Sequence, residues 1–97
     1  MDIRVGHGYD LHRLDTSANG AKNLLIGGVQ VDSELGPISH SDGDAVIHAI
    51  TDAILSAIGD PDLGTIFPNT GSENENRDSK DFLIESINRA NVGGWAI

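Results

Sequence analysis

The segment from His40 to Gly59 constrains the fold more than any other part of the chain. Ser41 is a candidate N-cap, and Asp44 follows three residues later, at the spacing of a capping box. Gly59 and the nearby Pro61 are typical helix terminators. The sequence therefore predicts a helix that begins soon after Ser41 and ends at Gly59.

The predicted helix has two faces of different character. Its aliphatic side chains fall on one broad arc at 100° per residue, and we expect this arc to pack on a core. The members of the arc are Val46, Ile47, Ile50, Ala53, Ile54, Ala57 and Ile58. Asp44, His48 and Asp52 are spaced four residues apart and line up on the opposite side. This polar stripe is either an ordinary solvated face or one side of a binding site.

Strand patterns precede the predicted helix. Residues 3–9 alternate in character and predict a strand, although Gly6 and Gly8 interrupt it. Glycine within a strand often marks the close approach of another backbone. Two short apolar runs, 24–26 and 29–31, flank a Gly-Gly pair and predict a hairpin.

Turns and a second helix follow the predicted helix. Residues 60–71 are rich in turn formers but carry three large apolar side chains, which predicts an ordered loop. A second amphipathic helix is expected from Lys80 to about Asn91, with Asp78 or Ser79 as its cap. The last residues, 95–97, look like entry into another strand.

These elements predict an α+β fold, a two-layer arrangement in which helices cover one face of a mixed β-sheet. One strand and one hairpin are too few to cover two apolar helix faces. We therefore expect residues 1–97 to be an incomplete domain that further sequence or another chain completes. An isolated chain with an unpaired strand is expected to be marginally stable.

Charge and composition exclude several classes of function. The chain has six Lys and Arg and fifteen Asp and Glu, which gives a net charge of −9. This acidic balance argues against a nucleic-acid partner. The negative net charge does not exclude phosphate ligands, because a bound divalent cation would supply local positive charge. With no cysteine, disulfides, thiolate zinc sites and cysteine nucleophiles are excluded. No apolar run has the ~18–20 residues of a membrane span, and if Met1 is the true start we expect a cytoplasmic protein.

Two residues near the N-terminus are candidate metal ligands together with His48 from the polar stripe of the helix. Asp10 and His12 are two residues apart, so in an extended segment they face the same way. With His48 they form a two-histidine, one-carboxylate set, which suits catalytic zinc with an open position or non-haem iron. Alternatively, His12 is a surface residue and His48 is a helix histidine held by Asp44 or Asp52.

Five groups of short motifs follow one another along the chain. They are Arg4–His12; Leu25–Val29; His40–Asp44 with His48 and Asp52; Asp62–Gly64 with Phe67–Pro68; and Asp78–Ser79. In this order and spacing they resemble the 2-C-methyl-D-erythritol 2,4-cyclodiphosphate synthase family. The resemblance covers nearly all 97 residues, but only the N-terminal portion of the family domain.

The resemblance implies an enzyme of non-mevalonate isoprenoid (terpenoid) biosynthesis. Such a phosphorus-oxygen lyase converts 4-diphosphocytidyl-2-C-methyl-D-erythritol 2-phosphate to the cyclic diphosphate and releases CMP. It also implies a homotrimer with active sites between subunits, in which the C-terminal part supplies the cytidine pocket. Because that part is absent here, the alternative is a truncated metal-binding fragment without activity of its own.

The resemblance also implies roles for individual residues. Asp10, His12 and His48 would hold zinc, His40 would stabilise the transition state, and a second divalent ion, magnesium or manganese, would bind the substrate diphosphate. The implied substrate contacts are Asp10, His12, His40, Ser41, Asp62, Leu63, Gly64, Phe67, Pro68, Asn69, Thr70 and Gly71. Asn69 departs from the aspartate that the family commonly has, and Gly71 also differs from a common acidic choice.

Overall fold

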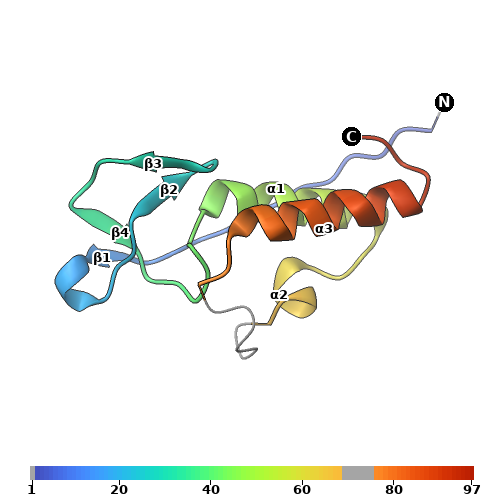
Figure 1. The fold of residues 1–97 in the computed structure, drawn as a ribbon. Helices are drawn as coiled ribbons and strands as arrows, with labels where there is room; N and C mark the ends of the chain where they lie inside the picture. The colour runs from blue at the N-terminus through green and yellow to red at the C-terminus, as the bar shows by residue number, and fades with distance from the viewer. Residues whose placement is uncertain (1, 69–75) are drawn as a thin grey trace.

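The computed structural model describes residues 2–68 and 76–97. A group of short strands lies beyond the N-terminal end of a pair of long helices (Figure 1). In chain order the elements are β1 (Leu14–Thr16), the 3-10 helix η1 (Ser17–Asn19), β2 (Leu24–Ile26), β3 (Val29–Val31), β4 (Leu35–Pro37), α1 (Ala45–Ile58), α2 (Leu63–Ile66) and α3 (Ser79–Val92). The α+β class expected from the sequence is confirmed.

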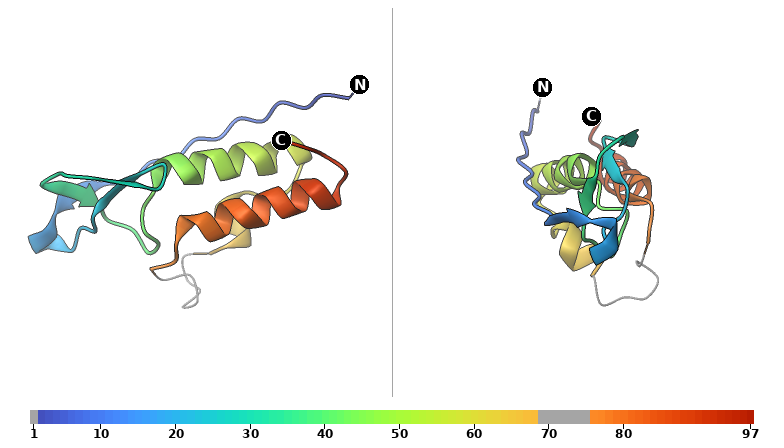
Figure 2. Two further views of the ribbon diagram at one scale, coloured as in Figure 1. Left: turned by 45° about the horizontal axis from the view of Figure 1, so that its top comes forward. Right: turned by 90° about the vertical axis from the view of Figure 1, so that its left-hand side faces the viewer.

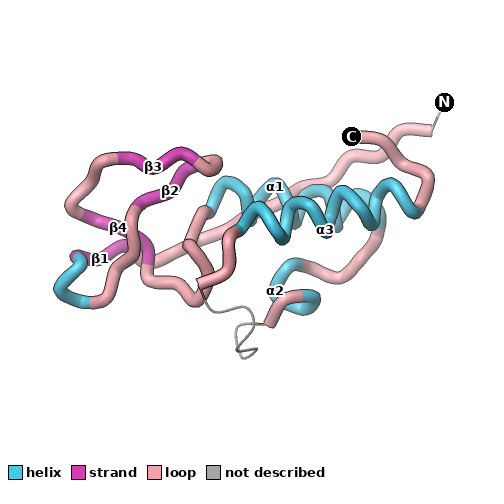
Figure 3. The backbone as a smooth tube through the Cα atoms, in the orientation of Figure 1, coloured by secondary structure: helices cyan, strands magenta, loops and turns pink. Residues whose placement is uncertain are grey.

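The strands form two separate two-stranded antiparallel sheets, both visible in Figure 3. In one, β1 pairs with β4, and in the other β2 pairs with β3 as the predicted hairpin. Gly27 and Gly28 have φ of 62° and 84°, as a two-residue hairpin turn with positive φ at both positions requires. The mixed sheet predicted from the sequence would also contain parallel strand pairs. The described residues form only antiparallel pairs.

The predicted strand at residues 3–9 is wrong, because residues 2–13 contain no strand. This extended segment runs beside α1 (Figure 2). A Cβ on Gly6 would lie 1.8 Å from the carbonyl oxygen of Ala53, and one on Gly8 would lie 1.7 Å from that of Ala49. The glycines therefore mark a close approach to a helix backbone, which offers no ladder of free hydrogen-bonding groups to a strand.

Helix α1 begins later than the sequence pattern predicts. Its N-cap is Asp44, whose Oδ1 accepts a hydrogen bond from the Ile47 amide at 3.1 Å. Ser41 as the N-cap is wrong, since Gly43 has a left-handed backbone (φ 77°) that interrupts any helix before Asp44. The predicted stop is confirmed, because Gly59 caps the helix with φ 76°.

The buried face of α1 differs from the predicted apolar arc, because α3 packs against another side of the helix. Val46 and Ile50 are 41% and 46% exposed. The buried residues of α1 are Ile47, His48, Thr51 and Leu55. In α3, whose N-cap is Asp78, Phe82 and Ala90 contribute buried apolar side chains. The polar stripe of Asp44, His48 and Asp52 therefore lies partly inside the molecule.

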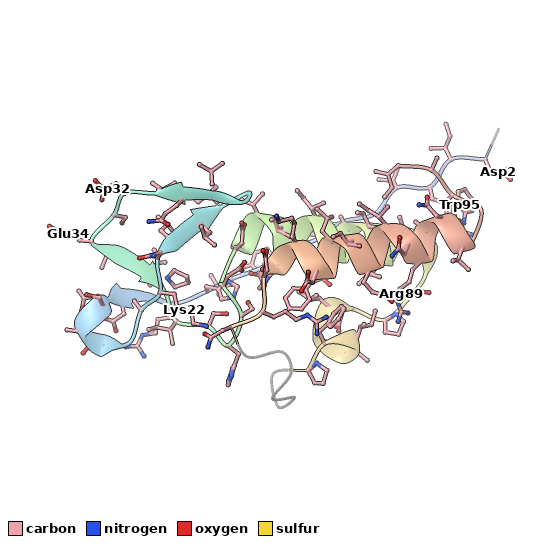
Figure 4. The ribbon with its side chains drawn as sticks, viewed as in Figure 1. Asp2, Lys22, Asp32, Glu34, Arg89 and Trp95 are labelled. Atoms are coloured by element: carbon pink, nitrogen blue, oxygen red, sulfur yellow. The ribbon has the colours of Figure 1, made fainter. Side chains whose placement is uncertain are left out.

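The first described residues of the N-terminal segment and the C-terminus lie at the same end of the molecule (Figure 1). The Arg4 guanidinium lies 4.4 Å from the ring centroid of Trp95, which is labelled near Asp2 in Figure 4. The radius of gyration is 14.2 Å, whereas a compact domain of this length is expected at about 12.5 Å. The chain is therefore more extended than a compact domain of its size.

Asp44 holds two parts of the fold together. Besides capping α1, its fully buried carboxylate accepts hydrogen bonds from the Gly27 amide at 3.0 Å and the Gly28 amide at 2.6 Å. Replacing Asp44 with alanine removes the cap and leaves two hairpin amides without their acceptor. We expect the free energy of unfolding, measured by urea denaturation, to fall by about 3 kcal/mol.

Asp78→Ala is the matched control, because Asp78 caps α3 through one exposed side-chain bond to the Lys80 amide. It removes a helix cap without touching the hairpin, so its loss of stability should be clearly smaller. Equal losses from the two variants would show that Asp44 acts only as a cap.

Candidate metal centre

Three side chains from two parts of the fold meet in the structure. Asp10 and His12 come from the extended N-terminal segment, and His48 comes from the buried side of α1. Asp10 Oδ2 lies 2.7 Å from His12 Nδ1 and 3.4 Å from His48 Nδ1. One ligand atom from each of the three residues lies within 4.8 Å of the other two. The geometry therefore offers one carboxylate oxygen and two imidazole nitrogens to a common point.

Two of these atoms lack a hydrogen-bond partner. Asp10 Oδ2 and His12 Nδ1 are buried and make no hydrogen bond to the described residues, although they lie 2.7 Å from each other. A buried polar atom without a partner is costly. A divalent cation would satisfy both atoms, and carboxylate with imidazole is a donor set suited to zinc or iron. The residues present therefore fit a bound divalent metal.

His48 is held in place by groups on its far side. Its Nε2 lies 2.7 Å from Ser79 Oγ and 3.3 Å from Ser41 Oγ, and the residue is 5% exposed. Burial lowers the pKa of His48 below its ordinary value of 6.5, outweighing the opposing attraction of Asp10. The neutral imidazole that metal ligation requires is thereby favoured.

The two carboxylates of the alternative interpretation, in which Asp44 or Asp52 holds His48, have other partners. Asp44 binds the hairpin turn, and Asp52 accepts a hydrogen bond from the Leu63 amide at 2.7 Å. The group behind Ser79 is instead Asp42, which accepts from the Ser79 amide at 2.8 Å and also from its hydroxyl. Burial acts to raise the pKa of Asp42, but the hydrogen bonds from Ser79 and the Asp44 backbone outweigh it and lower the pKa.

A pocket of about 670 Å³ opens beside the three ligands. Among the residues implied to contact substrate, those that line it are Asp10, His12, His40, Ser41, Leu63, Gly64 and Phe67. Asp62 does not line this pocket, because its side chain caps α2 through the Thr65 amide at 2.8 Å. Pro68 does not line it either. Asn69, Thr70 and Gly71 lie outside the described residues.

Lys22 is a pocket residue that no sequence pattern predicts. Its Nζ donates to the carbonyl oxygens of His40, at 3.0 Å, and of Ser41. Lys22 lies on the inner side of the strand region, toward the loop before α1 (Figure 4). With Arg13, which also lines the pocket, it brings positive charge to a site in an otherwise acidic chain. No motif in the sequence marks this position, because only the fold brings residue 22 beside residue 40.

Sequence comparison identifies the family. The model of the YgbB family matches residues 3–97. The chain belongs to the YgbB family. This chain is 45% identical over 97 residues to a protein of Rhodopirellula baltica named 2-C-methyl-D-erythritol 2,4-cyclodiphosphate synthase. The matched region covers all of this chain and 56% of that relative. It therefore spans about half the length of such a relative.

Two solved structures that this chain matches belong to proteins of the same name. A structure of 2C-methyl-D-erythritol-2,4-cyclodiphosphate synthase matches with a TM-score of 0.83 and 40% identity, over 94% of this chain and 58% of that one. A CDP-bound form matches with a TM-score of 0.82 and 40% identity, over the same shares. In the described part of the YgbB chain, no helix has the length and apolar character to cross a membrane.

Proposed function

We propose that residues 1–97 are the N-terminal portion of a single cyclodiphosphate-synthase domain that acts in non-mevalonate isoprenoid biosynthesis. The observation that carries this proposal is the convergence of Asp10, His12 and His48 at the edge of a pocket that also holds Lys22. A metal-ligand set beside a cation suits a diphosphate ligand. The family membership and the 45% identity to the R. baltica relative support the same activity.

The reaction is a cyclisation at phosphorus. An oxygen of the substrate's 2-phosphate forms a bond to the β-phosphorus, the bond from that phosphorus to the CMP oxygen breaks, and CMP leaves with the electron pair. Phosphoryl transfer asks a protein mainly for positioning and charge stabilisation. A bound divalent metal, which we propose to be zinc, would supply Lewis-acid stabilisation of the charge on the substrate diphosphate. The CDP-bound relative supports recognition of a nucleoside diphosphate by this fold.

Metal binding, charge stabilisation and substrate contact are assigned to different residues of this chain. Asp10, His12 and His48 would hold the metal at the pocket edge. His40 and Ser41 line the pocket on the loop before α1, where we propose that His40 stabilises charge in the transition state. The Lys22 ammonium holds that loop by donating hydrogen bonds to the carbonyl oxygens of His40 and Ser41. Leu63, Gly64 and Phe67 form part of the pocket wall and are proposed to contact the methylerythritol moiety.

The proposal extends to the assembled enzyme. A second divalent ion, magnesium or manganese, would sit on the substrate diphosphate, and the enzyme would be a cytoplasmic homotrimer with active sites between subunits. Large apolar side chains left exposed here support completion of the domain by further sequence or subunits. They include Ile3, Val5, Ile50, Ile84 and Val92.

A second candidate is a metal-binding fragment without turnover. Its support is the limited coverage, since the chain matches only 56% of the R. baltica relative. In this reading the Asp10, His12 and His48 set still binds metal, but the nucleotide part of the site is missing.

CMP release from the diphosphocytidyl substrate distinguishes these readings. The 97-residue chain is assayed with zinc and magnesium beside a chimera, in which residues 1–97 are joined to the C-terminal remainder of the R. baltica synthase. We expect the chimera to release CMP and its Asp10→Asn variant to release none above a buffer control. Release by the 97-residue chain would exclude the fragment reading. A folded, zinc-loaded chimera that releases no CMP would contradict the synthase proposal.

A further inference from the structure

A chain of hydrogen bonds continues from His48 away from the pocket. His48 Nε2 lies 2.7 Å from Ser79 Oγ, and the Ser79 hydroxyl donates to Asp42 Oδ1. Asp42 Oδ2 also accepts from the Ser79 amide at 2.8 Å. The middle residue, Ser79, is completely buried and is the first residue of α3. His48 lies in α1 and Asp42 lies in the loop before α1, so all three residues of this hydrogen-bond chain are held by the helix pair.

The positions of the protons follow from the chemistry of the three groups. An ionised carboxylate only accepts hydrogen bonds, and a serine hydroxyl has one proton to donate. Since Ser79 donates its proton to Asp42, it is left to accept from His48. His48 must then carry its proton on Nε2, and in the neutral ring Nδ1 keeps a free lone pair.

The free lone pair points where the metal is expected. His48 Nδ1 is the atom that lies 3.4 Å from Asp10 Oδ2. With the opposite tautomer, Nδ1 would carry the proton and could not ligate. The other hydroxyl near Nε2, that of Ser41, lies farther away, at 3.3 Å against 2.7 Å for Ser79.

We propose that Ser79 and Asp42 are positioning residues that hold His48 in the tautomer with its proton on Nε2, so that Nδ1 binds the metal. This inference rests on the proposed metal centre, but it does not depend on the reaction that the centre performs. A metal-bound histidine whose other nitrogen donates to a fixed acceptor is a recurrent arrangement, and losing such an acceptor typically weakens metal binding by about 10–100-fold.

The test compares Ser79→Ala and Ser79→Thr with the unmodified chain. Zinc affinity is measured by competition with a chelating dye, and the tautomer of His48 in the metal-free chain is read from its ring ¹⁵N chemical shifts. Ser79→Ala should lower zinc affinity by about 10–100-fold and lose the pure Nε2-protonated signature. Ser79→Thr keeps the hydroxyl and should restore both. Ser86→Ala is the matched control, because Ser86 is a buried serine of the same helix whose hydroxyl donates to the Leu83 carbonyl.

Two outcomes would overturn the positioning role, and a third bears on the metal centre. A Ser79→Ala chain with unchanged zinc affinity and an unchanged His48 tautomer would overturn the positioning role. Equal losses of affinity in Ser79→Ala and Ser86→Ala, with the tautomer unmoved, would overturn it as well, because they would report general destabilisation. Absence of zinc binding by the unmodified chain would reject the metal centre itself, while the ¹⁵N shifts would still decide whether Ser79 sets the tautomer.

Discussion

Replacing His48 with alanine is expected to lower the zinc affinity of the chain by at least about 100-fold, more than the 10–100-fold typical of losing a supporting hydrogen bond. His48 offers one of three ligand atoms that lie within 4.8 Å of one another, and its Nδ1 lies 3.4 Å from Asp10 Oδ2. A divalent metal held by only Asp10 and His12 would lose the ligand that comes from α1 and would keep two ligands from one extended segment. Isothermal titration with zinc measures the change.

Two further variants separate ligand loss from damage to the fold. His40→Ala removes an exposed histidine from the same pocket but outside the ligand cluster, so its zinc affinity should match that of the unmodified chain. Asp10→Asn keeps the size of a ligand side chain while removing its charge, and should reproduce the loss seen for His48→Ala. Full zinc affinity in either His48→Ala or Asp10→Asn would show that the metal assignment is wrong.

Gly8→Ala should have the second large effect, although it changes no ligand. An ideal Cβ at Gly8 would lie 1.7 Å from the Ala49 carbonyl oxygen of α1, a contact that only movement of the segment relieves. We expect a loss of at least about 2 kcal/mol in the free energy of unfolding, the order of cost found for overpacked sites. Since Asp10 and His12 follow on the same segment, zinc affinity should fall in the same variant.

Gly64→Ala is the matched control for this change. Its added Cβ would meet its nearest neighbour, Asp62 Oδ1, at 3.8 Å, an ordinary contact. Urea denaturation and zinc titration of both variants should show losses only for Gly8→Ala. A Gly8→Ala chain with unchanged stability and zinc affinity would show that the N-terminal segment does not pack on α1 as described.

Local sequence patterns predicted those features that depend on neighbouring residues. The Gly-Gly hairpin, the end of α1 at Gly59 and the second long helix all agree with the structure. The strand at residues 3–9 was wrong because alternation reveals an extended backbone but not its partner, and here the partner is helix α1. The pairing of β1 with β4 was also missed, since it joins residues far apart in the sequence by strands of three residues.

The candidate site shows the same division. The spacing of Asp10 and His12 in an extended segment, and the place of His48 on a helix, follow from the sequence because each depends only on local backbone geometry. Their meeting, the burial of His48 and its contact with Ser79 depend on how α1 packs against α3 and against the N-terminal segment. The contact of Lys22 depends on how the strand region packs against the loop before α1. Sequence alone determined which side chains are able to bind a metal. Only the tertiary structure decided which atoms face one another, because long-range packing sets the rotation of α1 and hence which of its sides is buried.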